Sequence, residues 1–244
     1  MLAKRVGAQV VVAGKQPLAS DMVWITVPDD AIADVAHVLA RTGEWKGKTV
    51  FHSSGALTSD ELAPLRAKGA RVASVHPMMT FVRGAVPQIE GVAFALEGDA
   101  AALRAARAIV NKLGGRPFTI RKENKVLYHV FGSFASPLVI ALMASMEEVA
   151  LAAGIRKPDI KPVIAPLLQQ TLRNYFKHDA AAAFSGPLAR GDIATVRKHL
   201  TALKQLPAVR ETYLALARLA GKRLPIRSRE IVALELAQHR EEHK

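Results

Sequence analysis

Residues 25–30, ITVPDD, decide the fold class that this sequence predicts. They follow the apolar segment MVW at residues 22–24 and precede AIADVAHVLA at residues 31–40. An apolar run that ends at a proline indicates a buried strand, and the apolar spacing after Asp30 indicates a helix. A strand that passes directly into a helix is the repeating unit of an open α/β sheet.

The same alternation fills the first half of the chain and then stops. Apolar runs predict strands at residues 8–12, 22–27, 48–51, 71–75, 92–96 and 117–120, and capped or amphipathic segments predict helices at residues 30–40, 58–69 and 99–113. Beyond Ile120 only helical patterns occur, at residues 122–154, 160–177, 192–205, 208–221 and 228–242. We expect an incomplete doubly wound, Rossmann-like α/β domain at residues 1–120 and an all-α domain at residues 121–244.

The amino-acid composition excludes disulfide-rich folds and some kinds of metal site. The 244 residues are 50% hydrophobic and contain no cysteine, so the chain can bury a core but has neither disulfides nor thiolate metal ligands. No pair of histidines has the setting of a metal site, and we expect no metal. No basic and then apolar leader opens the sequence, so a cytoplasmic location is expected.

The net charge of +13 lies mostly in the second half, where residues 121–244 hold 20 of the 34 basic and 11 of the 21 acidic residues. Aromatic residues are only 5% of the chain and do not alternate with the basic ones, so nucleic acid is not the expected partner. Residues 126–146 carry no charge and could span a bilayer. His129, Ser133 and Pro137 within that run favour a helix buried between domains, so no membrane partner is expected.

One element of a dinucleotide-binding sheet is missing. No G-x-G-x-x-G occurs in the sequence, and residues 2–7 have the basic and then glycine pattern of a last helical turn. We therefore expect that the sequence is truncated at its N-terminus and that an in-frame upstream segment encodes a strand and the glycine turn. Without that turn, the 244-residue chain should bind dinucleotide weakly.

Three of the predicted strands end in segments that contain polar residues. These segments are Val27, Pro28 and Asp29 at the end of the second run, Ser53, Ser54 and Gly55 after the third, and His76 after the fourth. The carboxyl ends of parallel strands meet at one edge of a sheet, where such folds bind their ligands. We expect a site there, although three separate loops would give the same pattern.

A second group of polar residues lies along the first long helix. Lys125, His129, Ser133 and Ser136 fall on one helical face, with Gly132 permitting close approach and Pro137 able to bend the helix. This face must meet water, a partner or a ligand. Further on, Arg190 in GPLARGD could hold a substrate anion, the alternative being a structural turn that ends in a capping Asp192.

Five stretches resemble one known family. They are FHSSGALTSDELAPLRAKGARVASVHPMMTF, EGVAFALEGD, LGG, KVLYHVFGSFASP and FSGPLARGD. They are similar to Rossmann-like oxidoreductases with a 6-phosphogluconate-dehydrogenase-like C-terminal domain of unknown function, relatives of pyrroline-5-carboxylate reductase and deazaflavin-dependent NADP reductase. The resemblance implies an N-terminal domain for NADP or NAD and a helical C-terminal domain that forms a homodimer.

The leading hypothesis is an NAD(P)-dependent oxidoreductase that moves a hydride to or from a small carbonyl or imine substrate. The nicotinamide would lie near Val27–Asp29 and Ser53–Gly55. Lys125 would donate a proton, His129 would hold the substrate or relay the proton, and His76 would orient the substrate; Ser133, Ser136 and Arg190 would line the site. The alternatives are a non-catalytic dimeric binding or scaffold protein and a protein that binds nucleic acid through its basic helices.

Overall fold

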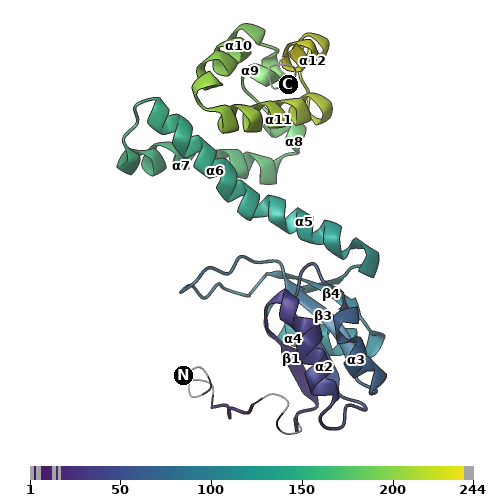
Figure 1. Ribbon diagram of the computed structural model, residues 1–244. Coiled ribbons are helices and arrows are strands. Elements are labelled where there is room, and N and C mark those ends of the chain that lie inside the picture. Colours follow the sequence, from purple (N-terminus) through teal and green to yellow (C-terminus); the bar gives the residue numbers. More distant parts are fainter. Residues whose placement is uncertain (1–2, 4–6, 13–14, 16–17, 239–244) are drawn as a thin grey trace. The chain divides into compact units, whose positions relative to one another are not determined.

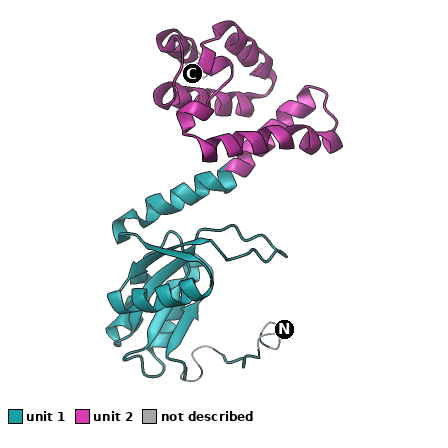
Figure 2. Cartoon of the chain, turned by 180° about the vertical axis from the view of Figure 1, so that it is seen from behind, with its two compact units in different colours: residues 1–138 teal, residues 139–244 magenta. Residues whose placement is uncertain are grey.

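The computed structural model describes residues 3, 7–12, 15 and 18–238 (Figure 1). The chain divides into two compact units, Met1–Leu138 and Val139–Lys244 (Figure 2). The first unit contains the sheet, and the described elements of the second are all helices. The structure therefore has the predicted fold class, a Rossmann-like sheet followed by helices.

The sheet contains five described strands in sequential order. They are β1 (Met22–Ile25), β2 (Thr49–His52), β3 (Arg71–Pro77), β4 (Ala93–Gly98) and β5 (Arg116–Thr119). β1, β2 and β3 are parallel, β4 is antiparallel to β3, and β5 is parallel to β4. Ile25 pairs with His52, and His52 pairs with Ser74, so the carboxyl ends of the three parallel strands finish at one edge.

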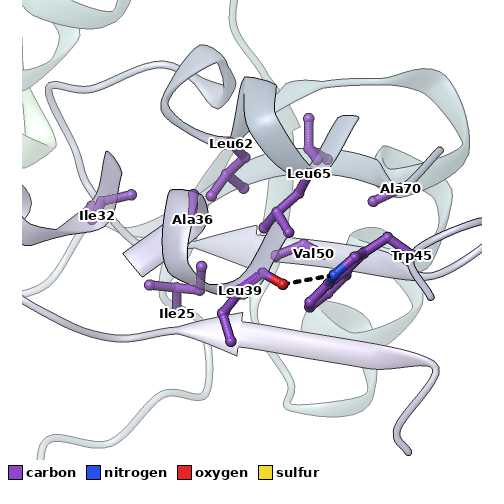
Figure 3. Close-up of a cluster of buried hydrophobic side chains, with 10 residues drawn as sticks. Ile25, Ile32, Ala36, Leu39, Trp45, Val50, Leu62, Leu65 and Ala70 are labelled. Atoms are coloured by element: carbon purple, nitrogen blue, oxygen red, sulfur yellow. Dashed lines mark hydrogen bonds between the residues drawn. The ribbon is translucent and has the colours of Figure 1, made fainter. Parts of the chain in front are cut away.

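One face of the sheet is covered by α2 (Ile32–Ala40) and α3 (Ala63–Ala67), each of which follows a short 3₁₀ turn, η1 (Asp29–Ala31) and η2 (Ser59–Leu62). Val50 points from the sheet into a buried cluster with Leu39 and Trp45 (Figure 3), and Val72 of β3 belongs to the same cluster. The Trp45 indole Nε1 donates to the Leu39 carbonyl at 2.9 Å, which satisfies the one polar atom of this buried ring.

The other face is covered by α4 (Ala100–Lys112). Ala102, Ala106 and Val110 lie four residues apart on one side of α4 and pack with Phe51 and Val75 of the strands. Since Val50 and Phe51 are neighbours in β2 and face opposite clusters, both faces of the sheet are covered by helices. This is the doubly wound arrangement that the alternation predicted.

The predicted strand at residues 8–12 is wrong. These residues pair with no described strand, and Val10 is 83% exposed. An apolar run becomes a strand only where a neighbour supplies its hydrogen bonds, and β1 pairs with β2 alone among the described strands. The helix end expected at residues 2–7 lies outside the described residues, apart from Ala3 and Gly7.

All described elements after β5 are helical, as predicted. They are η3 (Lys122–Asn124), α5 (Lys125–Ala135), α6 (Pro137–Ala152), α7 (Lys157–Lys177), α8 (Ala180–Ala183), α9 (Pro187–Arg190), α10 (Ile193–Ala202), η4 (Leu203–Gln205), α11 (Pro207–Arg223) and α12 (Arg229–Gln238). The strands do end before residue 121, yet the compact units divide between Leu138 and Val139. Helix α5 therefore belongs to the unit that contains the sheet.

The first long helix carries much exposed apolar surface. Within the described part of the chain, Lys122–Ala152 is the one helix long and apolar enough to cross a membrane, judged by length and composition alone. On α5, Leu127 is 71% exposed and Phe131 is 64% exposed. On α7, Leu167 is 63% exposed and Phe176 is 81% exposed. These side chains are among the large apolar groups that the two helices leave exposed to solvent in the described part of the chain.

Candidate functional site

The carboxyl ends of β1 and β2 are joined by side-chain hydrogen bonds. The Ser54 hydroxyl donates to the Asp29 carboxylate at 2.7 Å and accepts from the Leu57 amide at 2.9 Å. The Trp24 indole Nε1 donates to the Ser53 hydroxyl at 2.8 Å. These bonds fix the turn after β2, which brings Gly55 to the edge of the sheet.

Two histidine rings lie directly against Gly55. A Cβ atom added at Gly55 would lie 2.7 Å from His76 Nε2 and 2.8 Å from His129 Cδ2, closer than real Cβ atoms approach other atoms. His76 extends from β3, and His129 comes from α5; their ring centroids are 6.4 Å apart. Glycine is therefore required here by contact, and it allows the imidazoles from two elements to meet at one strand end.

Tyr128 forms a hydrogen bond with the Nδ1 atom of His76. Its hydroxyl lies 2.7 Å from His76 Nδ1, and the two rings meet edge to face at 5.5 Å. Burial lowers the pKa of His76 to about 4, with the Lys125 and His129 charges adding to the effect, and burial raises the pKa of Tyr128 to about 12. At neutral pH both side chains are uncharged, so the Tyr128 hydroxyl and the His76 ring form a hydrogen bond between two neutral groups.

A cavity of about 480 Å³ opens beside these rings. His76, Met78, Thr80, His129, Ser133 and Ser136 are among the residues that line it. A volume of this size suits a small organic molecule, and the polar lining groups can fix its orientation. The structure thus brings together four of the predicted site residues, His76, His129, Ser133 and Ser136.

Gly132 allows α5 to approach the loop after β3. A Cβ atom at this position would lie 3.1 Å from the Met78 sulfur, so the Met78 side chain would have to shift slightly to admit a larger residue. Helix α5 ends at Ala135, and α6 begins at Pro137, where the proline was expected to bend the helix. The break leaves Ser136 at the cavity wall.

Lys125 is buried against β3 and the turn after β2 and is not among the residues that line the cavity. Its side chain is 1% exposed, and its ammonium donates to the Ser54 carbonyl at 2.8 Å and to the Ser74 hydroxyl. Burial lowers the pKa of Lys125 to about 8, although the charges of Glu97 and Asp29 oppose the shift. These bonds anchor the first turn of α5 to β3 and to the turn after β2.

A second buried histidine supports the same edge. His52 is fully buried; its Nδ1 accepts from the Ser54 amide at 3.1 Å, and its Nε2 donates to the Thr58 carbonyl at 2.9 Å. Burial lowers the pKa of His52, which keeps the ring neutral. Both nitrogens are used within the fold, so His52 is a structural residue.

The other predicted residues fall in two places. Val27 and Pro28 lie at the end of β1, where Val27 is 36% exposed. Arg190 belongs to the second compact unit, where it lines a different cavity. Among the described residues, no group of three or more His, Asp or Glu side chains could hold a metal ion.

Sequence reasoning missed Tyr128 and Ser74. Tyr128 sits in the apolar run VLYHVF, and nothing in that pattern shows which ring faces β3. Ser74 is an isolated serine inside an apolar strand, which is a signal that could have been used, because a buried hydroxyl needs a partner. That partner is Lys125.

Comparison with known families places the chain. Residues 92–220 match the model of a domain of unknown function, DUF2520, and residues 3–77 match the model of a Rossmann-like domain. The chain belongs to the DUF2520 family. In this member, the family domain begins at β4 and includes α5 with Tyr128 and His129, whereas His76 and Gly55 lie in the Rossmann-like part.

Several solved structures share the fold of this DUF2520 chain. Protein TM1727 from Thermotoga maritima is 25% identical, with a TM-score of 0.71 over 98% of this chain and 87% of that one. BF3122 from Bacteroides fragilis, described as an NADP oxidoreductase, is 20% identical, with a TM-score of 0.74 over 91% and 83%. An imine reductase from Myxococcus stipitatus in complex with NADP⁺ is 16% identical, with a TM-score of 0.60 over 90% and 82%. No curated protein matches the sequence.

Proposed function

We propose that this DUF2520 protein is an NAD(P)-dependent oxidoreductase that moves a hydride to or from a small carbonyl or imine compound. One observation carries the proposal: His76 and His129 converge on Gly55 at the carboxyl end of β2, beside a cavity of about 480 Å³. Ligands of open α/β sheets bind at such strand ends. The imine reductase and the NADP oxidoreductase of the same fold agree with this reading.

The residues at the strand ends fit the nicotinamide end of the cofactor. Val27 and Asp29 are exposed beyond β1, and the His76 and His129 rings lie against Gly55 at the end of β2. The sequence has no G-x-G-x-x-G turn that would hold the pyrophosphate, so the fit extends to the nicotinamide end alone. When bound, a nicotinamide cofactor supplies or accepts the hydride.

The protein's own residues then bind the substrate and manage the proton. The Nδ1 atom of His76 accepts a hydrogen bond from the Tyr128 hydroxyl, so the ring carries its own hydrogen on Nε2. This N–H group can donate to a carbonyl oxygen or an imine nitrogen of the substrate. His129, exposed on the cavity wall, is the group that exchanges a proton with the substrate. Ser133 and Ser136 orient the remainder of the substrate. Lys125 is a positioning residue in this proposal, in place of the proton donor expected from sequence.

The proposal includes a cytoplasmic homodimer. Leu127, Phe131 and Phe134 are each more than 60% exposed on α5, whereas Lys125 of the same helix is buried against the strands. A second copy of the chain, presenting the same apolar face, is the occupant that best covers it.

Tryptophan fluorescence tests cofactor binding directly. The chain has two tryptophans, Trp24 beside the proposed nicotinamide site and Trp45 in the core. Titration with NADPH or NADH should quench Trp24 saturably, so Trp45→Phe retains the signal, whereas Trp24→Phe loses most of it. Failure of both dinucleotides to bind at millimolar concentration would overturn the proposal in favour of a non-catalytic protein.

A second measurement tests the reaction. NADPH consumption should be followed with a panel of small cyclic imines, ketones and aldehydes. A substrate from this panel should be reduced, and His129→Gln should lower its turnover by about a hundredfold while the quenching of Trp24 persists. Turnover that is the same in wild type and His129→Gln would remove His129 from the mechanism.

A further inference from the structure

A cavity in the second compact unit has the chemistry of an anion-binding site. It measures about 540 Å³ and lies between the turn before α9 and the start of α12. Three arginines, Arg190, Arg227 and Arg229, line it together with the apolar residues Phe184, Pro225 and Ile226. All of these residues lie in the second unit, whereas the residues that line the cavity at the strand ends lie in the first.

The backbone forces two of these arginines together. The Arg227 amide donates to the Ala189 carbonyl at 3.1 Å, which binds the residue before Arg190 to Arg227. Gly191 follows in the left-handed conformation with φ of 69°, and a Cβ atom there would lie 2.4 Å from the Arg227 carbonyl oxygen. Only glycine permits this approach. The turn therefore holds the backbone of Arg190 close to that of Arg227, despite the repulsion between the two positive charges.

The described lining of this cavity is basic and apolar. Among the described residues, it includes no aspartate or glutamate. The nearby Asp192 accepts from the Thr195 amide at 3.1 Å and the Thr195 hydroxyl at 2.7 Å, as the cap of α10. Those bonds hold the pKa of Asp192 below its usual range, with a smaller contribution from the Arg190 charge. Three like charges in one concavity are relieved by a bound anion, and guanidinium groups bind oxyanions in bidentate fashion.

We propose that this cavity binds the phosphate group of a small phosphomonoester. Arg190 and Arg227 hold the phosphate oxygens, and Arg229, whose Nη2 donates to the Leu224 carbonyl at 2.9 Å, is fixed at the rim. The apolar wall of Phe184, Pro225 and Ile226 contacts the organic part of the ligand. This site goes beyond hydride transfer and rests on the second unit alone.

The test is calorimetric titration of the full chain with inorganic phosphate and with phenyl phosphate, using phenol as the uncharged analogue. Phenyl phosphate should bind more tightly than inorganic phosphate, and phenol should not bind. The double variant Arg190→Gln/Arg227→Gln should weaken phenyl phosphate binding at least about tenfold, because charge-assisted hydrogen bonds are lost. Arg190→Lys, which keeps the charge but lacks the planar fork, should weaken it less.

A matched control separates a built site from general charge. Lys204→Gln/Arg223→Gln removes the same two charges from exposed positions of the second unit outside the cavity and should leave the affinity unchanged. Equal loss in both double variants, or no heat with wild type, would overturn the proposal. Retention of duplex DNA that only the cavity variants abolish would overturn it in favour of nucleic acid. NADPH quenching of Trp24 is measured in the same variants and should not change, so failure here is distinct from failure of the proposed function.

Discussion

The Tyr128 hydroxyl lies 2.7 Å from Nδ1 of His76, and this bond decides which nitrogen of the imidazole carries hydrogen. A neutral imidazole nitrogen is a stronger acceptor than a phenol oxygen, so the phenol donates and His76 keeps its hydrogen on Nε2. Nε2 is the atom nearest to a Cβ added at Gly55. A tyrosine on α5 thus directs a donor from β3 toward the strand edge.

Tyr128→Phe tests this relationship. The variant keeps the ring that packs at 6.0 Å from Phe118 and loses only the hydroxyl. We expect turnover to fall roughly tenfold to a hundredfold, as for other residues that orient a functional histidine, and stability to fall by about 1 kcal/mol. Nitrogen NMR of labelled histidine should show the Nε2–H form in wild type and a mixture in the variant. The same tautomer in both proteins would contradict the role of Tyr128.

The strand–helix alternation predicted the sheet because each parallel strand is buried on both faces and therefore apolar throughout. The run at residues 8–12 has the same composition, yet no described strand lies beside it to form a ladder. The antiparallel direction of β4 could not be predicted either, because an apolar run has the same composition in a parallel and in an antiparallel strand. The composition of a segment indicates whether it is buried. Which strand it pairs with, and in which direction, depends on residues that are far away in the sequence.

The site shows the same division. His76 and Gly55 could be located because they follow strands whose ends meet at one edge. The helical spacing predicted that Lys125, His129, Ser133 and Ser136 share a face, and the last three line the cavity. Periodicity could not show that Lys125 lies outside this lining, because its depth depends on Ser74, a partner on another element.

Gly55→Ala should disturb both histidines at once. The added methyl group would lie 2.7 Å from His76 Nε2 and 2.8 Å from His129 Cδ2, so both rings must shift. Misplacement of reacting groups by about 1 Å can cost on the order of a hundredfold in rate. The control is Gly221→Ala in α11, where a Cβ atom meets nothing within 4 Å and should stabilise the helix by about 0.5–1 kcal/mol. Full activity of Gly55→Ala would exclude this edge as the reaction site.

His76 should make the protein less stable in acid. Its pKa is about 4 in the folded protein against 6.5 for an ordinary histidine, so the unfolded chain binds more protons between these values. The free energy of unfolding therefore falls as the pH falls from 6.5 to 4, and the contribution is complete above 6.5. His76→Gln should flatten the dependence of urea unfolding on pH in this window. Curves with the same slope for wild type and variant would disagree with a buried neutral His76.

Lys125 should give a pH dependence of the same sign in alkali, because its pKa is also lowered on folding. Its pKa is about 8 when folded against 10.5 when unfolded, so the folded chain releases its proton first. Stability should rise as the pH rises from 8 to 10.5 in wild type, and this rise should be smaller in Lys125→Met. At neutral pH the variant should be less stable by about 1–3 kcal/mol, because the buried Ser74 hydroxyl and Ser54 carbonyl lose a donor.

The pH profile of turnover separates two roles for Lys125. As a positioning residue, it affects the rate through α5, so Lys125→Met should lower turnover without changing the shape of the profile. Loss of the alkaline limb in the variant would instead restore Lys125 as the proton donor. Both outcomes can be compared with His129→Gln, which should change the shape itself.

The apolar face of α5 should hold two copies of the chain together. Leu127, Phe131, Phe134 and Leu138 lie along one side of the helical segment and are 71%, 64%, 62% and 47% exposed. Such a stripe is costly to leave in water, and a second copy presents a matching one.

Sedimentation should give the mass of two chains at micromolar concentration for wild type. Leu127→Glu/Phe131→Glu should give the mass of one, because the interface would bury four unpaired carboxylates. Val86→Glu is the control, since Val86 is a 96% exposed valine outside the stripe and the change should leave the dimer intact. A wild-type mass of one chain would contradict the homodimer, and partition of wild type into lipid vesicles would indicate that the stripe contacts a membrane.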